Sequence, residues 1–208
     1  MAQAPALQKG IGVELVLTSN AAPEPEADEE DALIVTVTAK AGVYFGTNAV
    51  TTRELTERLK TRLSDRQQAV YIKADARTHY VNVENVLNAV RRAGVEAPIL
   101  LTARRESAET ETVLPPQGLQ VRLGARPLAA PQPAEVQLLD AATITLRVNY
   151  DDVTWDELQN KLDDFLQHQS PRVILIRADG LEPFAHVVRV VDVGRALDAT
   201  VVLVTPDL

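Results

Sequence analysis

Hydrophobic and polar positions follow a pattern along the chain that predicts alternating strands and helices. The segment Leu33–Thr38 is rich in β-branched residues and predicts a strand. Leu55, Leu59 and Leu63 recur every four residues, which predicts a helix with a single apolar face. The apolar run Val70–Ala74 predicts the next strand. Each helix of this kind needs a sheet or another helix to cover its apolar face.

A second helix and a final strand complete the predicted unit. Asn82–Ala93 carries its apolar residues on one face, and Gly94 stands where a left-handed helix cap is expected. Pro98–Thr102 predicts a strand, and Gly42–Gly46 predicts a short strand between two turns. The expected order is therefore β-β-α-β-α-β.

The first helix of this unit has a clear start signal. Thr51 and Glu54 have the spacing of a capping box, in which the hydroxyl and the carboxylate each bond the other residue's amide. Thr154 and Glu157 repeat this signal farther along the chain. The sequence thus predicts two equivalent helices, each beginning just after a threonine.

The capping boxes belong to a duplication that spans nearly the whole chain. The stretch Gly10–Thr102 reappears, diverged, as Gly118–Thr205, with its motifs in the same order. Two differences are expected. The Gly42–Gly46 hairpin has no visible counterpart between Val148 and Val153, and Leu197 stands where Gly94 did.

The predicted fold class is α+β. We expect two tandem two-layer repeats, each a mixed β-sheet with two helices on one face, arranged as a pseudo-dimer. The expected division is a leader and acidic linker over 1–30, a first repeat over 31–114, a leader-like strand and Pro-rich linker over 115–140, and a second repeat over 141–208.

Composition narrows the classes of protein that fit. Hydrophobic residues make up 46% of the 208 residues and aromatic residues only 4%, so the cores must be aliphatic. The net charge of −8 argues against a nucleic-acid-binding surface, which needs clustered Lys and Arg. The absence of cysteine excludes disulfides and thiolate sites. No apolar run reaches the ~18 residues that a membrane-spanning helix needs.

The acidic segment and the two leaders lie outside the predicted helices and have separate interpretations. Ala21–Asp31 is rich in proline and acid, which is typical of a solvated spacer, although an acidic binding segment has the same composition. The leaders Val13–Leu17 and Leu119–Leu123 alternate apolar residues, and we expect them to pair with a sheet edge, their own or a partner's. Val13, Leu15, Val121 and Leu123 are therefore candidate binding residues.

The most interesting acids are Asp75 and Asp179, because each ends a strand after a basic residue and an alanine. Each can cap the following loop through backbone amides, or can bind a partner or ligand. Tyr80 and Phe184 follow at equivalent positions and are expected at the rim of the core. The three histidines lack metal-ligand spacing, and no phosphate-binding loop or nucleophile motif occurs. We expect no metal, no cofactor and no enzyme activity.

Taken in order, these residues resemble the ExbD/TolR family of biopolymer-transport proteins, specifically its periplasmic domain. The resemblance covers nearly all of both repeats. It rests on Lys9-Gly10-Ile11-x-Val13-x-Leu15, the turn and short strand from Ala39 to Gly46, Val50 to Leu55, Ala74-Asp75, Tyr80, Val83, Val86, Ala93-Gly94 and Leu101-Thr102. In the second copy it rests on Val121-x-Leu123, Val153 to Leu158, Ala178-Asp179, Phe184 and Val204-Thr205.

The resemblance implies a non-enzymatic part of a proton-motive-force-driven transport or motility complex. Its implied partners are an ExbB/TolQ-like channel, reached through a membrane helix that this sequence lacks, and a TonB/TolA-like protein. A peptidoglycan-binding anchor is the alternative function. The implied location is the periplasm, and the missing N-terminal helix would anchor a full-length protein in the inner membrane. The sequence fits either an excised periplasmic portion or a soluble relative, and allows a homodimer in addition to the internal pair.

Three departures from the family pattern matter. The membrane helix with its proton-relay aspartate is absent, so this chain alone does not couple protons. Val16 and Gly124 stand where the leader of the family has proline. The chain carries two such domains, where family members usually carry one.

Overall fold

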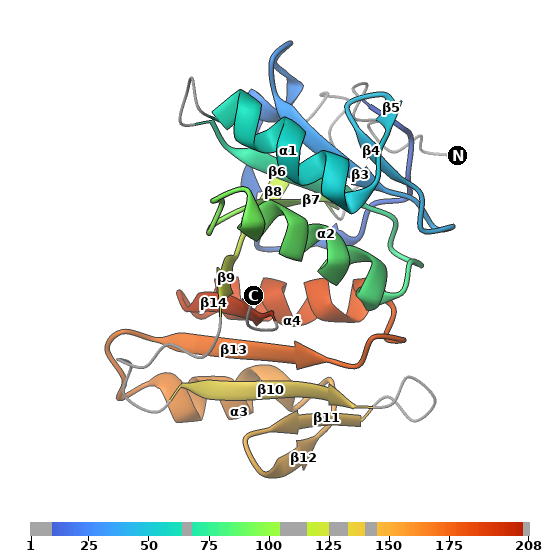
Figure 1. Ribbon diagram of the computed structural model, residues 1–208. Coiled ribbons are helices and arrows are strands. Elements are labelled where there is room, and N and C mark those ends of the chain that lie inside the picture. The colour runs from blue at the N-terminus through green and yellow to red at the C-terminus, as the bar shows by residue number, and fades with distance from the viewer. Residues whose placement is uncertain (1–9, 64–67, 105–115, 125–132, 140–144, 206–208) are drawn as a thin grey trace, which may run out of the picture.

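The structure is a computed structural model that describes residues 10–63, 68–104, 116–124, 133–139 and 145–205. The described chain forms two mixed β-sheets and four α-helices. Figure 1 shows the two sheets one above the other, with helices α2 (Tyr80–Arg92) and α4 (Phe184–Ala196) between them. The sequence analysis predicted an α+β fold, and its combination of helices with mixed sheets in two tandem parts is confirmed.

The first sheet has β3 (Leu33–Val37) near its middle. This strand pairs in parallel with β6 (Val70–Ala74) and antiparallel with β4 (Val43–Phe45), which continues into β5 (Asn48–Ala49) at one edge. On the other side, β6 pairs in parallel with β7. The remaining strands beyond β6 are β7 (Ile99–Arg104), β8 (Gln117–Gln120), β2 (Ala22–Pro23) and β1 (Leu17–Thr18).

The second sheet repeats this order with different residues. Its sequence of strands is β12-β11-β10-β13-β14-β9, which matches β5-β4-β3-β6-β7-β1 of the first sheet. The strands are β10 (Ala134–Leu139), β11 (Thr145–Val148), β12 (Asp151–Val153), β13 (Val173–Ala178), β14 (Thr200–Val204) and β9 (Arg122–Gly124).

The second repeat therefore contains the hairpin that the sequence analysis expected it to lack, and that expectation was wrong. β11 pairs antiparallel with β12, as β4 pairs with β5. Gly46 and Asn149 hold the same turn position, with φ of 62° and 56°. Asparagine tolerates the left-handed conformation better than other residues with a side chain, so it can replace the glycine.

Strand β10 lies inside the range 115–140 that the sequence analysis treated as a leader-like strand and linker. It pairs with β11 on one side and β13 on the other, so this part of the range belongs to the second sheet. Its residues alternate, with Ala134, Val136 and Leu138 buried and the residues between them partly exposed. That period of two is the signature of a strand with one face on the core.

Helix α1 (Thr52–Leu63) starts at its predicted capping box. The Thr51 hydroxyl accepts the Glu54 amide at 3.2 Å, and the Glu54 carboxylate accepts the Thr51 amide at 2.8 Å. The second box is only half formed. The Glu157 carboxylate accepts the Thr154 amide at 3.0 Å, but the helix α3 (Leu158–Leu166) begins after Glu157.

Helices α2 and α4, the second helix of each repeat, end in the same way. Gly94 follows α2 with φ of 94°, as its predicted role as a left-handed cap requires. Asp198, not Leu197, occupies the equivalent place after α4, with φ of 51°. The sequence analysis placed Leu197 at the position equivalent to Gly94, and this assignment was wrong by one residue.

The acidic segment is not a solvated spacer over its whole length, which corrects the first interpretation of Ala21–Asp31. Its short 3₁₀ helix η1 (Pro25–Asp28) packs Ala27, fully buried, against Ile34 and Tyr71 on the outer face of the first sheet. Burial, followed by the charges of Glu24 and its neighbours, raises the pKa of Tyr71 to about 12. The segment thus covers a sheet face.

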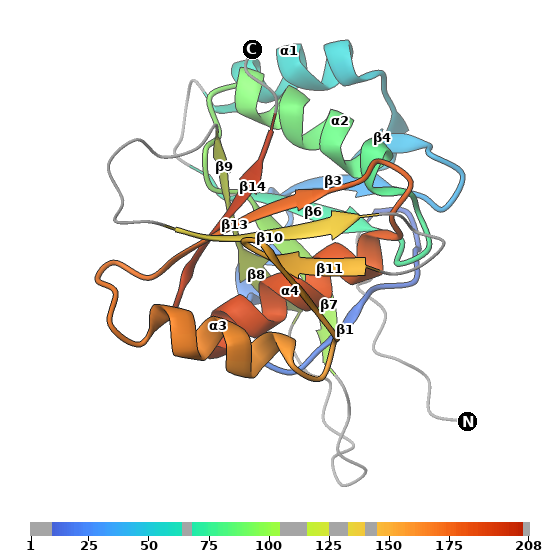
Figure 2. The ribbon, with the colours of Figure 1, turned by 90° about the horizontal axis from the view of Figure 1, so that it is seen from below.

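A single hydrophobic cluster extends through both repeats. It joins residues of the first repeat, such as Val35 and Leu87, to residues of the second, such as Val136 and Val190. Figure 2 shows why: α4 lies against β1 and β8, which belong to the first sheet, as well as against its own strands. Among the described residues, no helix is both long enough and apolar enough to cross a membrane.

Candidate functional site

The loops that follow β6 and β13 lie against each other and hold four of the predicted site residues, namely Asp75, Tyr80, Asp179 and Phe184. Tyr80 donates its main-chain N–H to the Glu182 carbonyl at 2.7 Å, and Phe184 donates to the Thr78 carbonyl at 2.8 Å. One residue farther on, Val81 donates to Gly180 at 2.9 Å and Ala185 donates to Ala76 at 3.1 Å. Each bond is matched by its equivalent with the repeats exchanged. We call residues 75–82 and 179–186 the junction loops.

Asp75 organises the first junction loop. Its carboxylate accepts the main-chain amides of Arg77 at 3.1 Å and Glu14 at 3.2 Å, and it also accepts the Arg77 guanidinium at 3.0 Å. The hydrogen bond from the Arg77 side chain is the main cause that lowers the pKa of Asp75, and burial opposes it. The carboxylate is thus already engaged with donors of its own chain.

Asp179 plays a simpler part in the second junction loop. Its carboxylate accepts the Leu181 amide at 2.8 Å, and the residue is exposed. Both aspartates therefore accept an amide two residues ahead, which is the loop-capping geometry expected from the sequence. Their binding role stays a prediction.

Tyr80 and Phe184 are both 1% exposed, so they lie inside the core. The sequence analysis expected them at the rim of the core, and that expectation was wrong. They are the first residues of α2 and α4, and both helix starts are hydrogen-bonded through the main chain to the opposite repeat, which places the two rings between the repeats. Burial raises the pKa of Tyr80 well above its ordinary value. Its hydroxyl has no hydrogen-bond partner within the described part of the chain.

The two junction loops differ in charge at one equivalent pair. In the first, Asn82 donates to the Thr78 hydroxyl at 3.2 Å. In the second, the His186 imidazole lies 2.8 Å from the buried Glu182 carboxylate. The ring of Trp155 packs on His186 at 5.5 Å and on the Arg189 guanidinium at 4.4 Å. Sequence reasoning missed this cluster, because nothing in the sequence places Trp155 beside α4.

The leaders pair with sheet edges, as expected, although as shorter strands. β1 pairs in parallel with β7, and Val16 accepts the Ala103 amide at 2.9 Å. Val13 and Leu15 precede this strand and are partly buried, whereas Val121 and Leu123 are buried. Neither residue set is shown to bind a partner.

The second leader, Gln117–Gly124, contributes to both sheets. Its first half, β8, pairs antiparallel with β7 of the first sheet. Its second half, β9, pairs in parallel with β14 of the second sheet. Other hydrogen bonds also join the two repeats. The Asn20 main-chain amide donates to the Asp192 carboxylate at 2.9 Å, and the Arg91 guanidinium donates to the Thr205 hydroxyl at 2.9 Å.

The histidines are dispersed. His79 lies 2.8 Å from the Leu181 carbonyl, His186 contacts Glu182, and His168 is exposed. Within the described ranges, no cluster of three or more His, Cys, Asp or Glu could hold a metal ion. The junction loops pack the two repeats against each other through main-chain hydrogen bonds.

Comparison with protein families gives two matches along the chain. The family described as biopolymer transport protein ExbD/TolR matches residues 2–105 and again residues 99–207. No curated protein matches the chain. The two matches together span nearly the whole sequence and coincide with the two copies recognised from its motifs. The chain therefore belongs to the ExbD/TolR family and carries two copies of its domain.

Proposed function

We propose that the chain is a non-enzymatic periplasmic component of a proton-motive-force-driven transport or motility complex, in which it binds a TonB/TolA-like protein. Membership of the ExbD/TolR family supports the connection to such a complex. The observation that carries the proposal is the double family match, because it identifies both halves of the chain with the same transport component. An ExbB/TolQ-like channel is the proposed second partner.

The two repeats, in this proposal, act as a pseudo-dimer. The reciprocal main-chain bonds of the junction loops support it, since a two-fold interface uses the same surface on both sides. The proposed division keeps the first repeat over 31–114 and starts the second at Ala134, where β10 begins, with 1–30 and the segment before β10 as leaders. Covalent linkage keeps the partners at an effective concentration of roughly millimolar or above.

Partner binding, as we propose it, uses strand addition at the edge that β1 occupies. The strand is only two residues long and Leu17 is 54% exposed, so an incoming strand has few bonds to displace. The partner then pairs with Ala103 and Arg104 of β7. Val13 and Leu15, which precede β1, move with it, while Asp75 releases the Glu14 amide.

The test combines hydrogen exchange with two binding partners. The chain is incubated with the periplasmic segment of its own organism's TonB/TolA-like protein, and with purified peptidoglycan in a separate arm. Slower exchange at Ala103 and Arg104 with the protein segment alone supports the proposal. If the chain sediments with peptidoglycan and the protein segment does not change its hydrogen exchange, the anchoring function replaces the proposed partner binding. Unchanged exchange at Ala103 and Arg104 with the protein segment, and protection of Val13 to Leu17 equal to that in the free chain, would exclude strand addition at this edge.

A further inference from the structure

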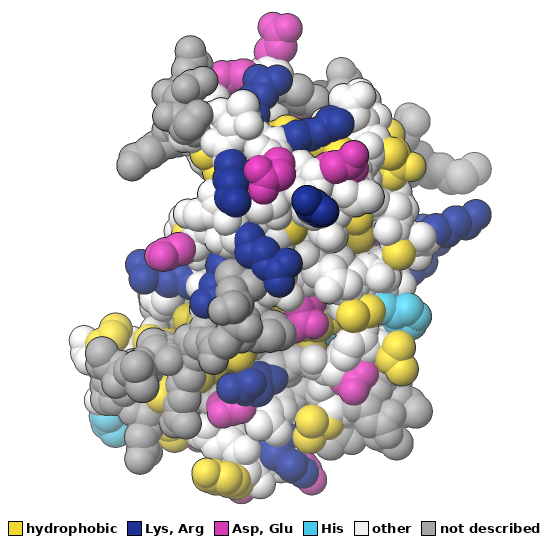
Figure 3. Space-filling model, in the orientation of Figure 1, with side chains coloured by type: hydrophobic (Ala, Val, Ile, Leu, Met, Phe, Trp, Pro, Cys, Tyr) yellow, Lys and Arg dark blue, Asp and Glu magenta, His cyan; other side chains and the backbone are white. Residues whose placement is uncertain are grey.

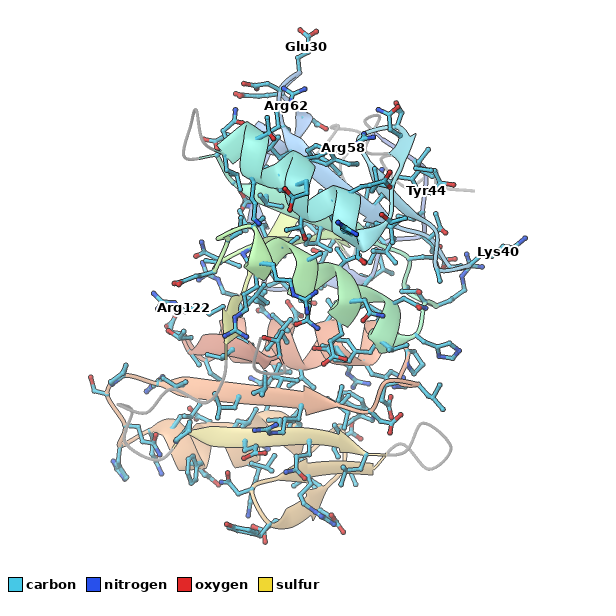
Figure 4. All side chains as sticks on the ribbon, in the orientation of Figure 1. Glu30, Lys40, Tyr44, Arg58, Arg62 and Arg122 are labelled. Carbon is cyan, nitrogen blue, oxygen red and sulfur yellow. The ribbon has the colours of Figure 1, made fainter. Side chains whose placement is uncertain are left out.

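The second half of α1 and the β4–β5 hairpin enclose a pocket that the junction loops do not reach. Its volume is about 540 Å³, and two arginines enter it from the helix. Figure 4 shows Arg58 and Arg62 on α1 and Tyr44 on the neighbouring hairpin. The pocket is lined by Gly10, Phe45, Gly46, Thr47, Asn48, Arg58, Thr61 and Arg62.

Positive charge is concentrated in this pocket, although the chain as a whole is acidic. Arg58 and Arg62 are one helical turn apart and exposed. Neither forms an ion pair with another described residue. Glu54 is near enough for Arg58 to contribute to lowering its pKa, but its carboxylate is bonded first to Thr51. Figure 3 shows basic side chains gathered over α1 on this face, with acidic ones among them.

In the second repeat, the residue equivalent to Arg58 is a lysine that forms an ion pair with a carboxylate. Asp151 on β12 pairs with Val148, as Asn48 on β5 pairs with Phe45, so the two hairpins keep the same register. Lys161 of α3 stands where α1 has Arg58. Its ammonium group lies 2.7 Å from the Asp151 carboxylate. The first repeat has a neutral amide, Asn48, in place of that carboxylate.

We propose that the pocket of the first repeat binds a carboxylate side chain presented by an extended peptide segment of a protein partner. The ligand carboxylate takes the place that Asp151 fills in the second repeat, and it accepts hydrogen bonds from Arg58. Guanidinium groups suit this role because they bind carboxylates through two parallel bonds.

An extended peptide fits better than a free anion for two reasons. Asp151 is itself part of a strand, so the internal example is a carboxylate on extended backbone. In addition, β5 is the last strand at its end of the first sheet, and no strand of the described residues pairs with its outer side, where a further strand could add. The half-buried ring of Phe45 offers an apolar contact for the residue beside the acid. This site lies apart from β1, so it stands whether or not the proposed strand addition occurs there.

The test is a nuclear magnetic resonance titration of the full chain with two capped peptides, Ac-Val-Asp-Val-NH2 and Ac-Val-Asn-Val-NH2. We expect the acidic peptide to shift the amides of Gly46, Thr47 and Asn48 and the Nε–H of Arg58 in a saturable way. The neutral peptide should not. Arg58→Ala should weaken binding about tenfold or more, as expected for loss of a charge-assisted bidentate bond.

Two variants separate the site from general charge effects. Arg53→Ala removes a cation of the same helix that does not line the pocket, and it should leave the affinity unchanged. Asn48→Asp gives the first repeat the acid of the second, and should close the pocket by pairing with Arg58, with at least a similar loss of binding. The proposal is overturned if Asn48→Asp, folded as judged by its amide spectrum, binds as well as the parent chain. Equal effects of Arg53→Ala and Arg58→Ala, or an equal shift with inorganic phosphate, would also overturn it.

Discussion

Tyr80 and Phe184 begin equivalent helices, and each donates its main-chain N–H to a carbonyl of the opposite repeat. The two rings are buried to the same extent, yet only one of them carries a hydroxyl. The junction is thus symmetric in its backbone and asymmetric in its side chains.

Tyr80→Phe is expected to stabilise the protein by about 1 kcal/mol, because the buried hydroxyl has no partner in the described structure and its desolvation is not compensated. The reverse change in the other repeat, Phe184→Tyr, should destabilise it by about 1–3 kcal/mol for the same reason. Urea unfolding of both variants measures the two shifts. Shifts of the same sign would show that the hydroxyl is not the deciding group.

Thr51→Ala is expected to cost about 1 kcal/mol of stability, since it removes the acceptor for the Glu54 amide. Thr154→Ala should cost less. The Thr154 hydroxyl donates to Glu157 at 2.8 Å, whereas α3 begins only at Leu158. Thermal unfolding of the pair provides the comparison, and an equal loss in both would contradict the half-formed second box.

The sequence predicted much of the fold because its signals are local. The helix stripes, both capping boxes and the left-handed cap at Gly94 need only neighbouring residues. β10 was missed because Pro131 and Pro133 directly precede it and favoured a linker, although its period-two pattern was present. The second hairpin was missed because Asn149 replaces the glycine that marked the first.

The sites were harder to predict than the fold, because they depend on contacts between distant segments. Ala27 is buried on the outer face of the sheet, but the sequence around it has no periodic hydrophobic pattern that would predict this burial. The pocket beside Arg58 requires the hairpin to fold back toward α1. The one usable signal was the change from Asp151 to Asn48 at equivalent positions, which becomes visible only once the hairpins are aligned.

Gly194→Ala is expected to destabilise the protein by about 1–3 kcal/mol through overpacking. An added Cβ would lie 2.6 Å from Val201 Cγ2 and 3.2 Å from Ile174 Cδ1, so α4 would have to move away from its sheet. Gly124→Ala is the matched control, because no atom of the described residues lies within 4 Å of its added Cβ. Chemical denaturation of the two variants tests the difference, and equal stabilities would argue against close packing of α4.

Asp75 should make the stability of the protein sensitive to acid. Its pKa is lower in the folded chain than in the unfolded chain, mainly because of Arg77. Its carboxylate therefore contributes stability above the unfolded value, ~4, and this contribution is lost as the pH falls through the folded value. Asp75→Asn should remove this part of the acid dependence.

Urea midpoints between about pH 2 and pH 7 measure the dependence on Asp75, because this range covers the unfolded carboxyl pKa near 4 and the lower folded value. Asp179→Asn serves as the matched variant, since its exposed carboxylate accepts a single loop amide and its loss should cost less at pH 7. If Asp75→Asn follows the parent curve at every pH, the Arg77 contact does not stabilise the fold.

The second leader, with β8 in one sheet and β9 in the other, also bears on the history of the chain. A gene that encoded only the first repeat would end before β8, and β7 would keep an open edge over most of its length. A gene for the second repeat alone would carry β8 without a strand to receive it. Open edges of this kind promote aggregation. Separating the two repeats would therefore leave an open sheet edge on at least one of them, which disfavours their existence as independent single domains.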